Sequence, residues 1–465
     1  MTLRYHSARG RLVLVAAILG SGMAFLDGTA VNVALPAIER DLHTGFAGLQ
    51  WILNGYLLAL AALVLPGGAL ADRLGRRRIF ITGVIWFALA SLLCGVAPNT
   101  EILIASRVLQ GVGAALLVPA SLALLQGAYV AQDRGEAIGA WSGFSGLTTI
   151  IGPLLGGWFS DTVSWRLVFL INPVLALVTL YVAWRWAPES RDAEARPPDI
   201  AGTLAAAAGL GGVVFALIEG PDMGWRHPAV VVAAILGVVG AVTFLLVEFR
   251  SAHPMLPLGF FRRRRFAGVT AASVTIYFAL GGLMFLLALQ LQQVLGYTAL
   301  KAGASLAPVT LMLLILSPLA GKLAARIGPR LPMTMGPFLA AIAVALMSRI
   351  VAGVSYVGTI LPAVLVFGLG LGFTVAPLTA AAMSALEDEH AGLASGVSNA
   401  VTRVAQLLAI SVLPFAAGLS GLGRVETAAF SHGFSRAMWI AAGIMCAGAL
   451  ISFLTVRGPM QAKPS

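Results

Sequence analysis

Two ionisable side chains, Asp27 and Arg107, lie deep inside long apolar stretches of the sequence. Charging an aspartate in hydrocarbon costs at least ~2.5–3.5 kcal/mol, so we expect it to face a partner or a water-filled cavity. At 1.5 Å per helical residue, Asp27 lies about 22 Å above the start of its stretch, and Arg107 about 7 Å below the opposite face of a ~30 Å core. The two charges are therefore level. We expect Asp27 to bind the proton in a coupled reaction and Arg107 to modulate its proton affinity; a static pairing of Asp27 with Arg107 or Asn32 is the alternative.

A third charged side chain, Arg403, lies about 13 Å from the inner end of its apolar stretch. Asn399 and Gln406, at i−4 and i+3, share its side of a helix. Because the last six apolar stretches contain no acid, Arg403 has to pair with a distant acid, bind backbone carbonyls or water, or meet an anionic ligand group. Structural hydrogen bonding is favoured over substrate binding.

The elements that position these side chains are predicted to be membrane-spanning helices. The chain has 465 residues, of which 59% are hydrophobic and 11% charged, and its mean hydropathy is +0.91. Soluble domains have roughly 45–50% apolar and about 25% charged residues, so soluble enzymes, disordered scaffolds and disulfide frameworks are excluded.

Fourteen stretches are long enough to cross a bilayer. They lie near residues 12–34, 49–71, 79–97, 102–126, 138–159, 166–186, 201–219, 228–248, 266–288, 302–321, 332–350, 359–383, 394–418 and 433–456. We expect the first to be a retained span and not a signal peptide.

The basic residues predict an orientation. With both termini in the cytoplasm, 21 of the 30 Lys and Arg residues lie on the cytoplasmic side. Cytoplasmic loops of membrane proteins carry such an excess, so the net charge of +11 is explained without a nucleic-acid partner. Binding of anionic lipids by the arginines at 73–78 and 262–265 is the alternative reading of those clusters.

An internal repeat predicts two halves. Residues 68–77 (GALADRLGRR) and 321–330 (GKLAARIGPR) match at six of ten positions. This favours six-helix bundles at 1–187 and 263–465, joined by a linker with two additional helices at 188–262. Asp72 in the first copy is Ala325 in the second. We expect a conformational latch in which Asp72 meets the start of the helix near residues 392–395; an acid that only balances its neighbouring arginines is the alternative. The latch residues are Gly68, Asp72, Arg73, Gly75, Arg76 and Arg77.

Aromatic, amide and sulfur side chains in the apolar stretches could line a central substrate cavity, because apolar pockets with a few polar groups suit lipophilic ligands. Aromatic residues that simply face lipid are the alternative. The candidate cavity residues are Phe25, Asn32, Trp51, Asn54, Tyr56, Gln110, Trp141, Phe144, Tyr277, Met284, Gln290, Asn399 and Arg403. A small-residue motif, Gly152, Pro153, Gly156 and Gly157, allows close helix packing and a kink.

Several segments resemble the major facilitator superfamily, and within it the 14-span drug:proton antiporters. They are LDGTAVNVALP (26–36), GALADRLGRRR (68–78), ILIASRVLQGVGAA (102–115), IGPLLGG (151–157) and SWRLVFLINP (164–173). The linker from EGPDMGW (219–225) to HPMLPL (253–258) and the loop LQLQQVLGYTALKAG (289–303) resemble the 14-span branch. The resemblance implies a major facilitator fold, alternating access, and export against inward proton flow. It also implies that the motif at 151–157 seals the protein against proton leak. The chain departs from the family pattern after Arg403, where Val404, Leu407 and Leu408 stand.

We therefore expect an all-α polytopic membrane protein that exports hydrophobic drugs or natural products, cationic ones included, in exchange for protons. A dedicated exporter of one antibiotic, lipid or metabolite is the first alternative, and a non-transporting receptor or scaffold the second. We expect no enzyme activity, no cofactor beyond the proton gradient, no metal and no nucleic acid. The expected setting is a monomer, in contact with membrane lipids, in a bacterial cytoplasmic membrane.

Overall fold

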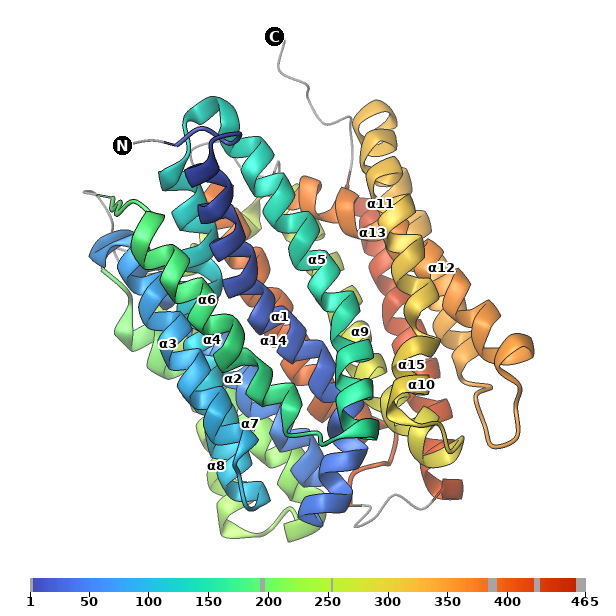
Figure 1. The fold of residues 1–465 in the computed structure, drawn as a ribbon. Coiled ribbons are helices and arrows are strands. Elements are labelled where there is room, and N and C mark those ends of the chain that lie inside the picture. Colours follow the sequence, from blue (N-terminus) through green and yellow to red (C-terminus); the bar gives the residue numbers. More distant parts are fainter. Residues whose placement is uncertain (1–2, 193–196, 252–253, 384–390, 422–426, 457–465) are drawn as a thin grey trace. The chain divides into compact units, whose positions relative to one another are not determined.

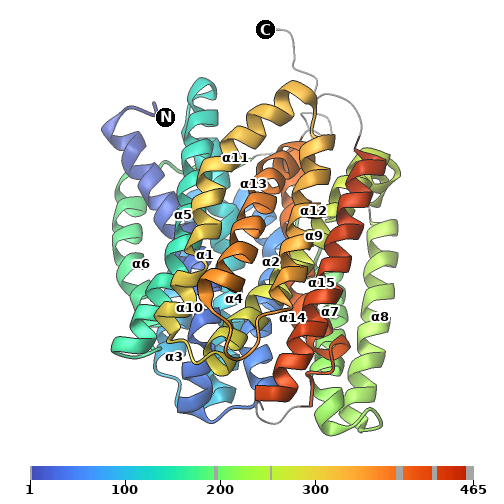
Figure 2. The ribbon, with the colours of Figure 1, turned by 90° about the vertical axis from the view of Figure 1, so that its right-hand side faces the viewer.

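The protein is helical throughout the part of the chain that its structure, a computed structural model, describes. That part comprises residues 3–192, 197–251, 254–383, 391–421 and 427–456. Within it, the only strand-like pairing is an isolated bridge between Leu3 and Tyr129. Fourteen helical segments are long and apolar enough to cross a membrane, which confirms the predicted all-α membrane fold (Figures 1 and 2).

The helices of the first half and the linker are α1 (Ala8–Leu42), α2 (Phe46–Leu74), α3 (Arg76–Gly95), α4 (Thr100–Ala128), α5 (Ala131–Thr162), α6 (Leu167–Trp186), α7 (Ile200–Met223) and α8 (Pro228–Arg250). Those that follow are α9 (Arg264–Leu289), α10 (Ala299–Ser305), α11 (Ala307–Ile327), α12 (Arg330–Met347), α13 (Leu361–Met383), α14 (Ala391–Ala416) and α15 (Thr427–Thr455). Short helical turns lie at Leu258–Arg262, Gln290–Val294 and Tyr356–Ile360. Together, α10 and α11 make one membrane-length segment.

Most helices extend past the predicted apolar stretches at one end or both, because a helix continues through polar flanking residues until its ends are capped. The first stretch was expected at residues 12–34, whereas α1 runs from Ala8 to Leu42. Its start is capped by the Ser7 hydroxyl, which accepts from Gly10 N at 3.0 Å. The α4 helix starts in the same way, with the Asn99 side chain accepting from Ile102 N at 2.9 Å.

The chain divides into two compact units. The first comprises Met1–Ala216, Gly224–Met255 and Thr298–Leu300, and the second comprises Leu217–Met223, Leu256–Tyr297 and Lys301–Ser465. Helix α8 and most of α7 therefore group with the first unit. The functional division at residues 188–262 stays a prediction.

Each unit packs its six principal helices in the same pairs. In the first unit α1 packs against α5 and α6, α4 against α2 and α3, and α3 against α6. In the second unit α9 packs against α14 and α15, α13 against α11 and α12, and α12 against α15. Counted in chain order, with α10 and α11 as one, the same helices are neighbours in both units. This is the packing that the internal repeat predicts.

Both copies of the repeated segment turn at a glycine. Gly75 lies between α2 and α3 with φ +116°, and Gly328 occupies the equivalent position between α11 and α12 with φ +88°. Residues with a Cβ rarely adopt positive φ, so glycine is required at both turns.

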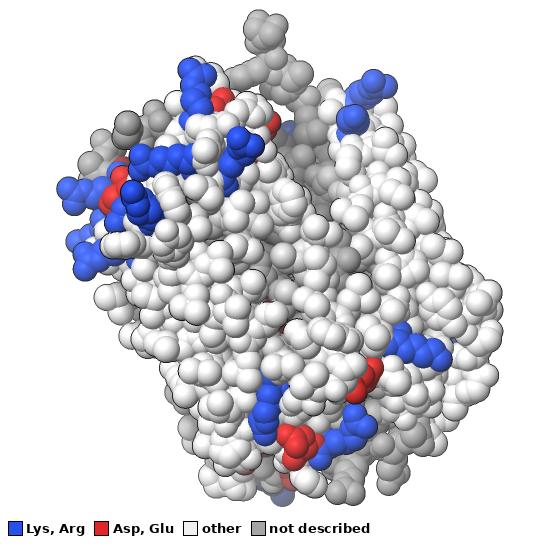
Figure 3. Space-filling model, viewed as in Figure 1, with Lys and Arg blue, Asp and Glu red and all other residues white. Residues whose placement is uncertain are grey.

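One end of the first unit gathers many of its arginines. The N-terminal segment reaches the end of α4 there, through Leu3 N to Ala128 O at 2.7 Å. The segment after α6 reaches the turn between α2 and α3 through Arg76 N to Ser190 O at 2.9 Å. Figure 3 shows the Lys and Arg side chains clustered over this end, near the N-terminus marked in Figure 1. We call it the basic end.

Candidate functional site

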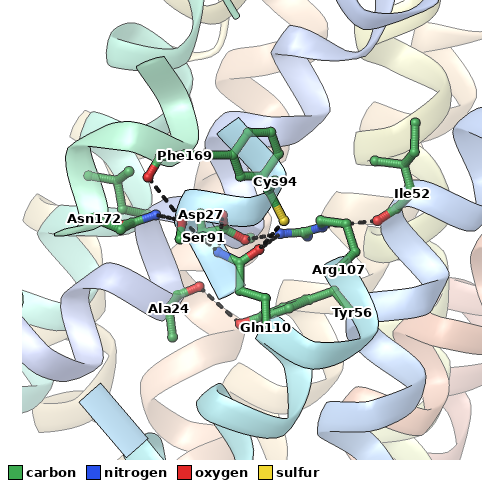
Figure 4. A network of polar contacts seen from close by, with 12 residues as sticks. Ala24, Asp27, Ile52, Tyr56, Ser91, Cys94, Arg107, Gln110, Phe169 and Asn172 are labelled. Carbon is green, nitrogen blue, oxygen red and sulfur yellow. Dashed lines mark hydrogen bonds and ion pairs between the residues drawn. The ribbon is translucent and has the colours of Figure 1, made fainter. Parts of the chain in front are cut away.

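Asp27 and Arg107 form a buried ion pair inside the first unit. Asp27 lies on α1 and Arg107 on α4, and both residues have 0% exposure. Arg107 Nη1 donates to Asp27 Oδ2 at 2.5 Å (Figure 4). The level charges expected from the sequence are therefore in direct contact, while the proton-coupling role stays a prediction.

Gln110 links both members of the pair. It lies one turn after Arg107 on α4 and is fully buried. Its Nε2 donates to Asp27 Oδ1 at 2.9 Å, and its Oε1 accepts from Arg107 Nη1 at 2.6 Å. The carboxylate of Asp27 thus meets a donor at each oxygen, which stabilises its charged form in a desolvated site.

An outer layer of polar groups surrounds Gln110. Ser91 on α3 accepts from Gln110 Nε2 at 3.1 Å and from Asn172 Nδ2 of α6 at 2.9 Å, and donates to Phe169 O at 2.9 Å. Cys94, also on α3, donates from Sγ to Gln110 Oε1 at 3.5 Å. Four helices, α1, α3, α4 and α6, therefore contribute side chains to one network (Figure 4).

The rest of the Arg107 guanidinium is held by α2 and by aromatic rings. Its Nε donates to Ile52 O at 3.0 Å. The ring of Tyr56 lies 4.5 Å from its Cζ and that of Phe169 lies 5.6 Å from it, both within cation–π range. Tyr56 is fixed in turn by a hydrogen bond from Oη to Ala24 O at 3.3 Å.

This arrangement can couple proton binding to a structural change. Protonation of Asp27 removes the charge that compensates Arg107. A buried cation without a counter-charge costs several kcal/mol, so the protonated state favours movement of Arg107 toward water or another anion. The site can therefore act as a proton-operated switch.

The small-residue motif of α5 provides close helix contacts. A Cβ on Gly156 would lie 2.6 Å from Ala30 O of α1, and one on Gly152 would meet Thr29 of the same helix. A Cβ on Gly157 would lie 2.6 Å from Leu300 Cα, in the short piece Thr298–Leu300 that groups with this unit. Pro153 lies between these glycines, inside α5. The motif thus leaves no space for side chains on two sides of α5.

At the basic end, several of the expected latch residues form hydrogen bonds within the first unit. Asp72 Oδ1 accepts from Arg76 Nε at 2.9 Å, the local pairing of the alternative reading. The Glu189 carboxylate accepts from Arg77 N and Arg78 N, both at 3.1 Å. Gly75 is buried, Gly68 is half-buried and Arg73 is exposed. The side chains of residues 392–395, the expected latch partner, lie outside those described.

The cavity candidates of the first unit are placed at several depths. Asn54, Tyr56 and Gln110 are buried. Tyr56 and Gln110 belong to the network around Arg107. Phe25, Asn32, Trp51 and Trp141 are half-buried, and Phe144 is 53% exposed. Asn32 Nδ2 donates to Gly28 O of its own helix at 2.9 Å, and Trp141 Nε1 donates to Ser21 Oγ at 2.8 Å.

The cavity candidates of the second unit lie on α9, in the helical turn that follows it, and on α14. Arg403 Nη1 donates to Gln406 Oε1 at 3.2 Å, and Asn399 is exposed. Gln290 is fully buried and donates to Ile350 O at 2.6 Å and Ser431 Oγ at 3.2 Å. Tyr277, packed beside a hydrophobic cluster, and Met284 are half-buried. The assignment of all these residues to a cavity stays a prediction.

Sequence reasoning missed the outer layer of the buried network. Asn172 lies within the segment 164–173, whose resemblance to the family offered a signal. Ser91 and Cys94 lie in an ordinary apolar stretch that offered none. Their part in the site comes from the packing of α3 against α4 and α6.

Comparisons with known proteins show the family to which the chain is similar. The sequence profile described as Major Facilitator Superfamily matches residues 17–410. The multidrug resistance protein Stp of Mycobacterium tuberculosis is 36% identical over 86% of this chain and 75% of its own length. The puromycin resistance protein of Streptomyces alboniger is 34% identical over 97% of this chain and 92% of its own. The methylenomycin A resistance protein of Bacillus subtilis is 33% identical, over 87% of each chain.

Solved structures show the same fold. A bacterial homologue of the human lysosomal transporter Spinster, in an inward-facing and unoccupied conformation, has a TM-score of 0.68 at 18% identity, over 97% of each chain. A POT family transporter, in complex with a thioalcohol-conjugated peptide, has a TM-score of 0.70 at 14% identity, over 96% of each chain. At these identities the likeness concerns the fold alone.

Proposed function

The chain belongs to the Major Facilitator Superfamily, and from that premise we propose that it is a proton-coupled antiporter that exports hydrophobic small molecules by alternating access. Membership makes it a multi-pass membrane transporter of small molecules and not an enzyme. Coupling to protons and the direction of transport are the proposed steps.

The observation that carries the proposal is the buried pair of Asp27 and Arg107 with Gln110 beside it. A scaffold that only keeps a transporter fold has no need for opposed charges at membrane depth, where ionisable residues are costly and functional. A proton is the smallest ligand that neutralises Asp27, and the inward proton gradient can then drive the opposite movement of a substrate.

The proposed substrates are hydrophobic drugs or natural products, including cationic ones. One relative is named for multidrug resistance, while two others are named for resistance to a single antibiotic, puromycin or methylenomycin A. Those two names favour a second candidate, a dedicated exporter of one natural product. The broad and narrow alternatives share the proposed coupling site and differ in the substrate cavity.

The proposed setting is the cytoplasmic membrane of a bacterium, with both termini in the cytoplasm and a monomer as the working unit. The excess of Lys and Arg at the basic end supports the orientation, because such residues mark the cytoplasmic side. No cofactor is proposed beyond the proton gradient.

Uptake into energised, inside-out membrane vesicles tests the coupling, because export from the cytoplasm appears in them as accumulation inside the vesicle. We expect wild-type protein to transport ethidium in a way that a protonophore abolishes, and D27N to lose that proton-driven transport. The matched control is D41N, because Asp41 lies near the end of the same helix in an exposed pair with Arg166. Coupled transport by D27N at the wild-type rate would exclude Asp27. Absence of transport by the wild type for ethidium, puromycin and other lipophilic compounds would favour the scaffold alternative.

A further inference from the structure

The side-chain amide of Gln110 has its two ends facing groups of opposite hydrogen-bonding character. At Nε2, the acceptors are Asp27 Oδ1 at 2.9 Å and Ser91 Oγ at 3.1 Å. At Oε1, the donors are Arg107 Nη1 at 2.6 Å and Cys94 Sγ at 3.5 Å. Both amide hydrogens and both lone pairs of the amide oxygen are thus used. A flip of the amide would place its N–H groups against the donors Arg107 and Cys94 and its oxygen against the acceptors Asp27 and Ser91.

Ser91 can act only as an acceptor toward Gln110. A hydroxyl has one hydrogen and two lone pairs. The hydrogen goes to Phe169 O at 2.9 Å, and Asn172 Nδ2 uses one lone pair at 2.9 Å. The remaining lone pair is left for Gln110 Nε2. Because Asn172 and Phe169 belong to α6, the contact between α3 and α6 determines how the Ser91 hydroxyl is oriented toward Gln110 on α4.

We propose that Ser91 is a positioning residue for the proton site, because its hydroxyl holds the Gln110 amide with an N–H directed at Asp27. The inference rests on the proposed function, since it concerns the same carboxylate. Ser91 does not touch Asp27; it acts through Gln110. Ser91 and Cys94 lie one turn apart on α3 and both contact the Gln110 amide. Ser91 accepts from the amide nitrogen, and Cys94 donates to the amide oxygen.

The proposal predicts a change in the pH at which Asp27 takes up its proton. In S91A, a buried N–H of Gln110 loses its acceptor, and the amide shifts to find another. The hydrogen bond from Gln110 to Asp27 weakens, so the charged carboxylate loses part of its stabilisation. We expect proton uptake at a higher pH in this variant, by roughly one pH unit.

The test is infrared titration of purified, full-length protein in lipid nanodiscs. The carbonyl stretch of a protonated carboxyl group is followed against pH, and the contribution of Asp27 is identified by its loss in D27N. We expect S91A to shift the midpoint of that band upward by roughly one unit, with a parallel shift of the pH profile of ethidium efflux. A merely structural role would lower the amount of folded protein and leave the midpoint unchanged.

Three variants keep the result interpretable. S121A is the matched control, because Ser121 is a fully buried serine of α4 whose hydroxyl donates within its own helix, to Val118 O at 2.7 Å. S91C is nearly isosteric and has a weaker acceptor, so a smaller shift in the same direction is expected if S91A fails to fold. S91T retains a hydroxyl on Cβ and should therefore keep the wild-type midpoint.

The outcomes separate the two proposals. If D27N removes a titrating band while S91A and S91C keep the wild-type midpoint, Asp27 is a proton site and the role of Ser91 is overturned. If D27N leaves every titrating band in place, Asp27 is not the proton-binding carboxylate and both proposals fall. A shift in S91A that S121A reproduces would also overturn the role of Ser91.

Discussion

Arg107 Nη1 contacts Asp27 Oδ2 and Gln110 Oε1 at once, so one guanidinium nitrogen joins α1 to a second position on its own helix α4. The ion-pair partners are 80 residues apart in the chain, and their side chains are no more than 1% exposed. Because neither charge can reach water where it lies, each depends on the other. This mutual dependence makes the pair suitable for a switch and costly to break on one side only.

A double-mutant cycle should show this dependence. R107Q leaves a buried carboxylate without its cation, and removal of one partner of a buried pair costs about 3–5 kcal/mol. We expect R107Q to lower the thermal unfolding temperature in detergent far more than the neutral double variant D27N/R107Q. The exposed pair of Asp41 and Arg166 serves as the control, since such pairs contribute about 0–1 kcal/mol. Equal destabilisation by R107Q and by the double variant would contradict the prediction.

Tyr56 should contribute to the site through its ring more than through its hydroxyl. The ring lies 4.5 Å from Arg107 Cζ, and a desolvated cation–π contact contributes about 2 kcal/mol. The hydroxyl donates to Ala24 O at 3.3 Å, a bond that contributes about 1 kcal/mol. Y56F should therefore lower stability slightly, and Y56L clearly more. Thermal unfolding of the two variants side by side measures the difference, and equal losses would show that the hydroxyl dominates.

The fold was predictable because length and composition constrain a membrane chain severely. Apolar stretches of about 20 residues have only one way to satisfy their backbone polar groups in lipid, namely as helices, and all fourteen are found. The repeat at residues 68–77 and 321–330 also predicted the common packing of the two units. Where helices end depends on caps such as Ser7, so the predicted bounds differ from the observed ones at most helix ends.

The candidate site was predictable only where a charge stood out. Asp27 and Arg107 were found because charges at membrane depth are rare. The rise of 1.5 Å per helical residue then placed both side chains at the same depth of the bilayer. Ser91 and Cys94 could not be found, because a serine or cysteine in a membrane helix usually bonds to its own helix. Their role follows from which face of α3 meets α4, and that rotation is set by packing.

Gly156 should be intolerant of a side chain. A Cβ there would lie 2.6 Å from Ala30 O and 3.0 Å from Ala30 Cα, and backbone atoms cannot move aside cheaply. G156A should separate α5 from α1, lower the unfolding temperature and increase proton leak through vesicles that contain the protein. The control is G139A, since a Cβ on Gly139 of the same helix meets nothing within 4 Å. There the better helix propensity of alanine should stabilise by up to ~1 kcal/mol. A wild-type unfolding temperature for G156A would show that α5 and α1 adjust freely.

Glu189 should stabilise the start of α3. Its carboxylate accepts from Arg77 N and Arg78 N, which have no partner within the helix at this end. Loss of such a cap costs about 0.5–2 kcal/mol, so E189A should increase hydrogen exchange of these two amides and lower the unfolding temperature. E189Q keeps an acceptor and loses only the attraction of a negative charge to the helix N-terminus, so its effect should be smaller. E136Q, an exposed glutamate of α5 near His6, is the control. Unchanged amide exchange in E189A would contradict the assignment of the cap.

Tyr129 should make stability depend on pH at the alkaline end. Burial raises the pKa of its phenol to about 12 from an ordinary value of 10.0, and its Oη donates to Gly10 O at 2.5 Å. The unfolded chain ionises this group first. The stabilisation is therefore complete below pH 10 and is lost as the pH rises toward 12, by about 1 kcal/mol at pH 11. Unfolding temperatures measured between pH 8 and pH 11 should fall more steeply for the wild type than for Y129F, which has no proton to lose at this position. Parallel curves for the two proteins would show that another group controls the alkaline transition.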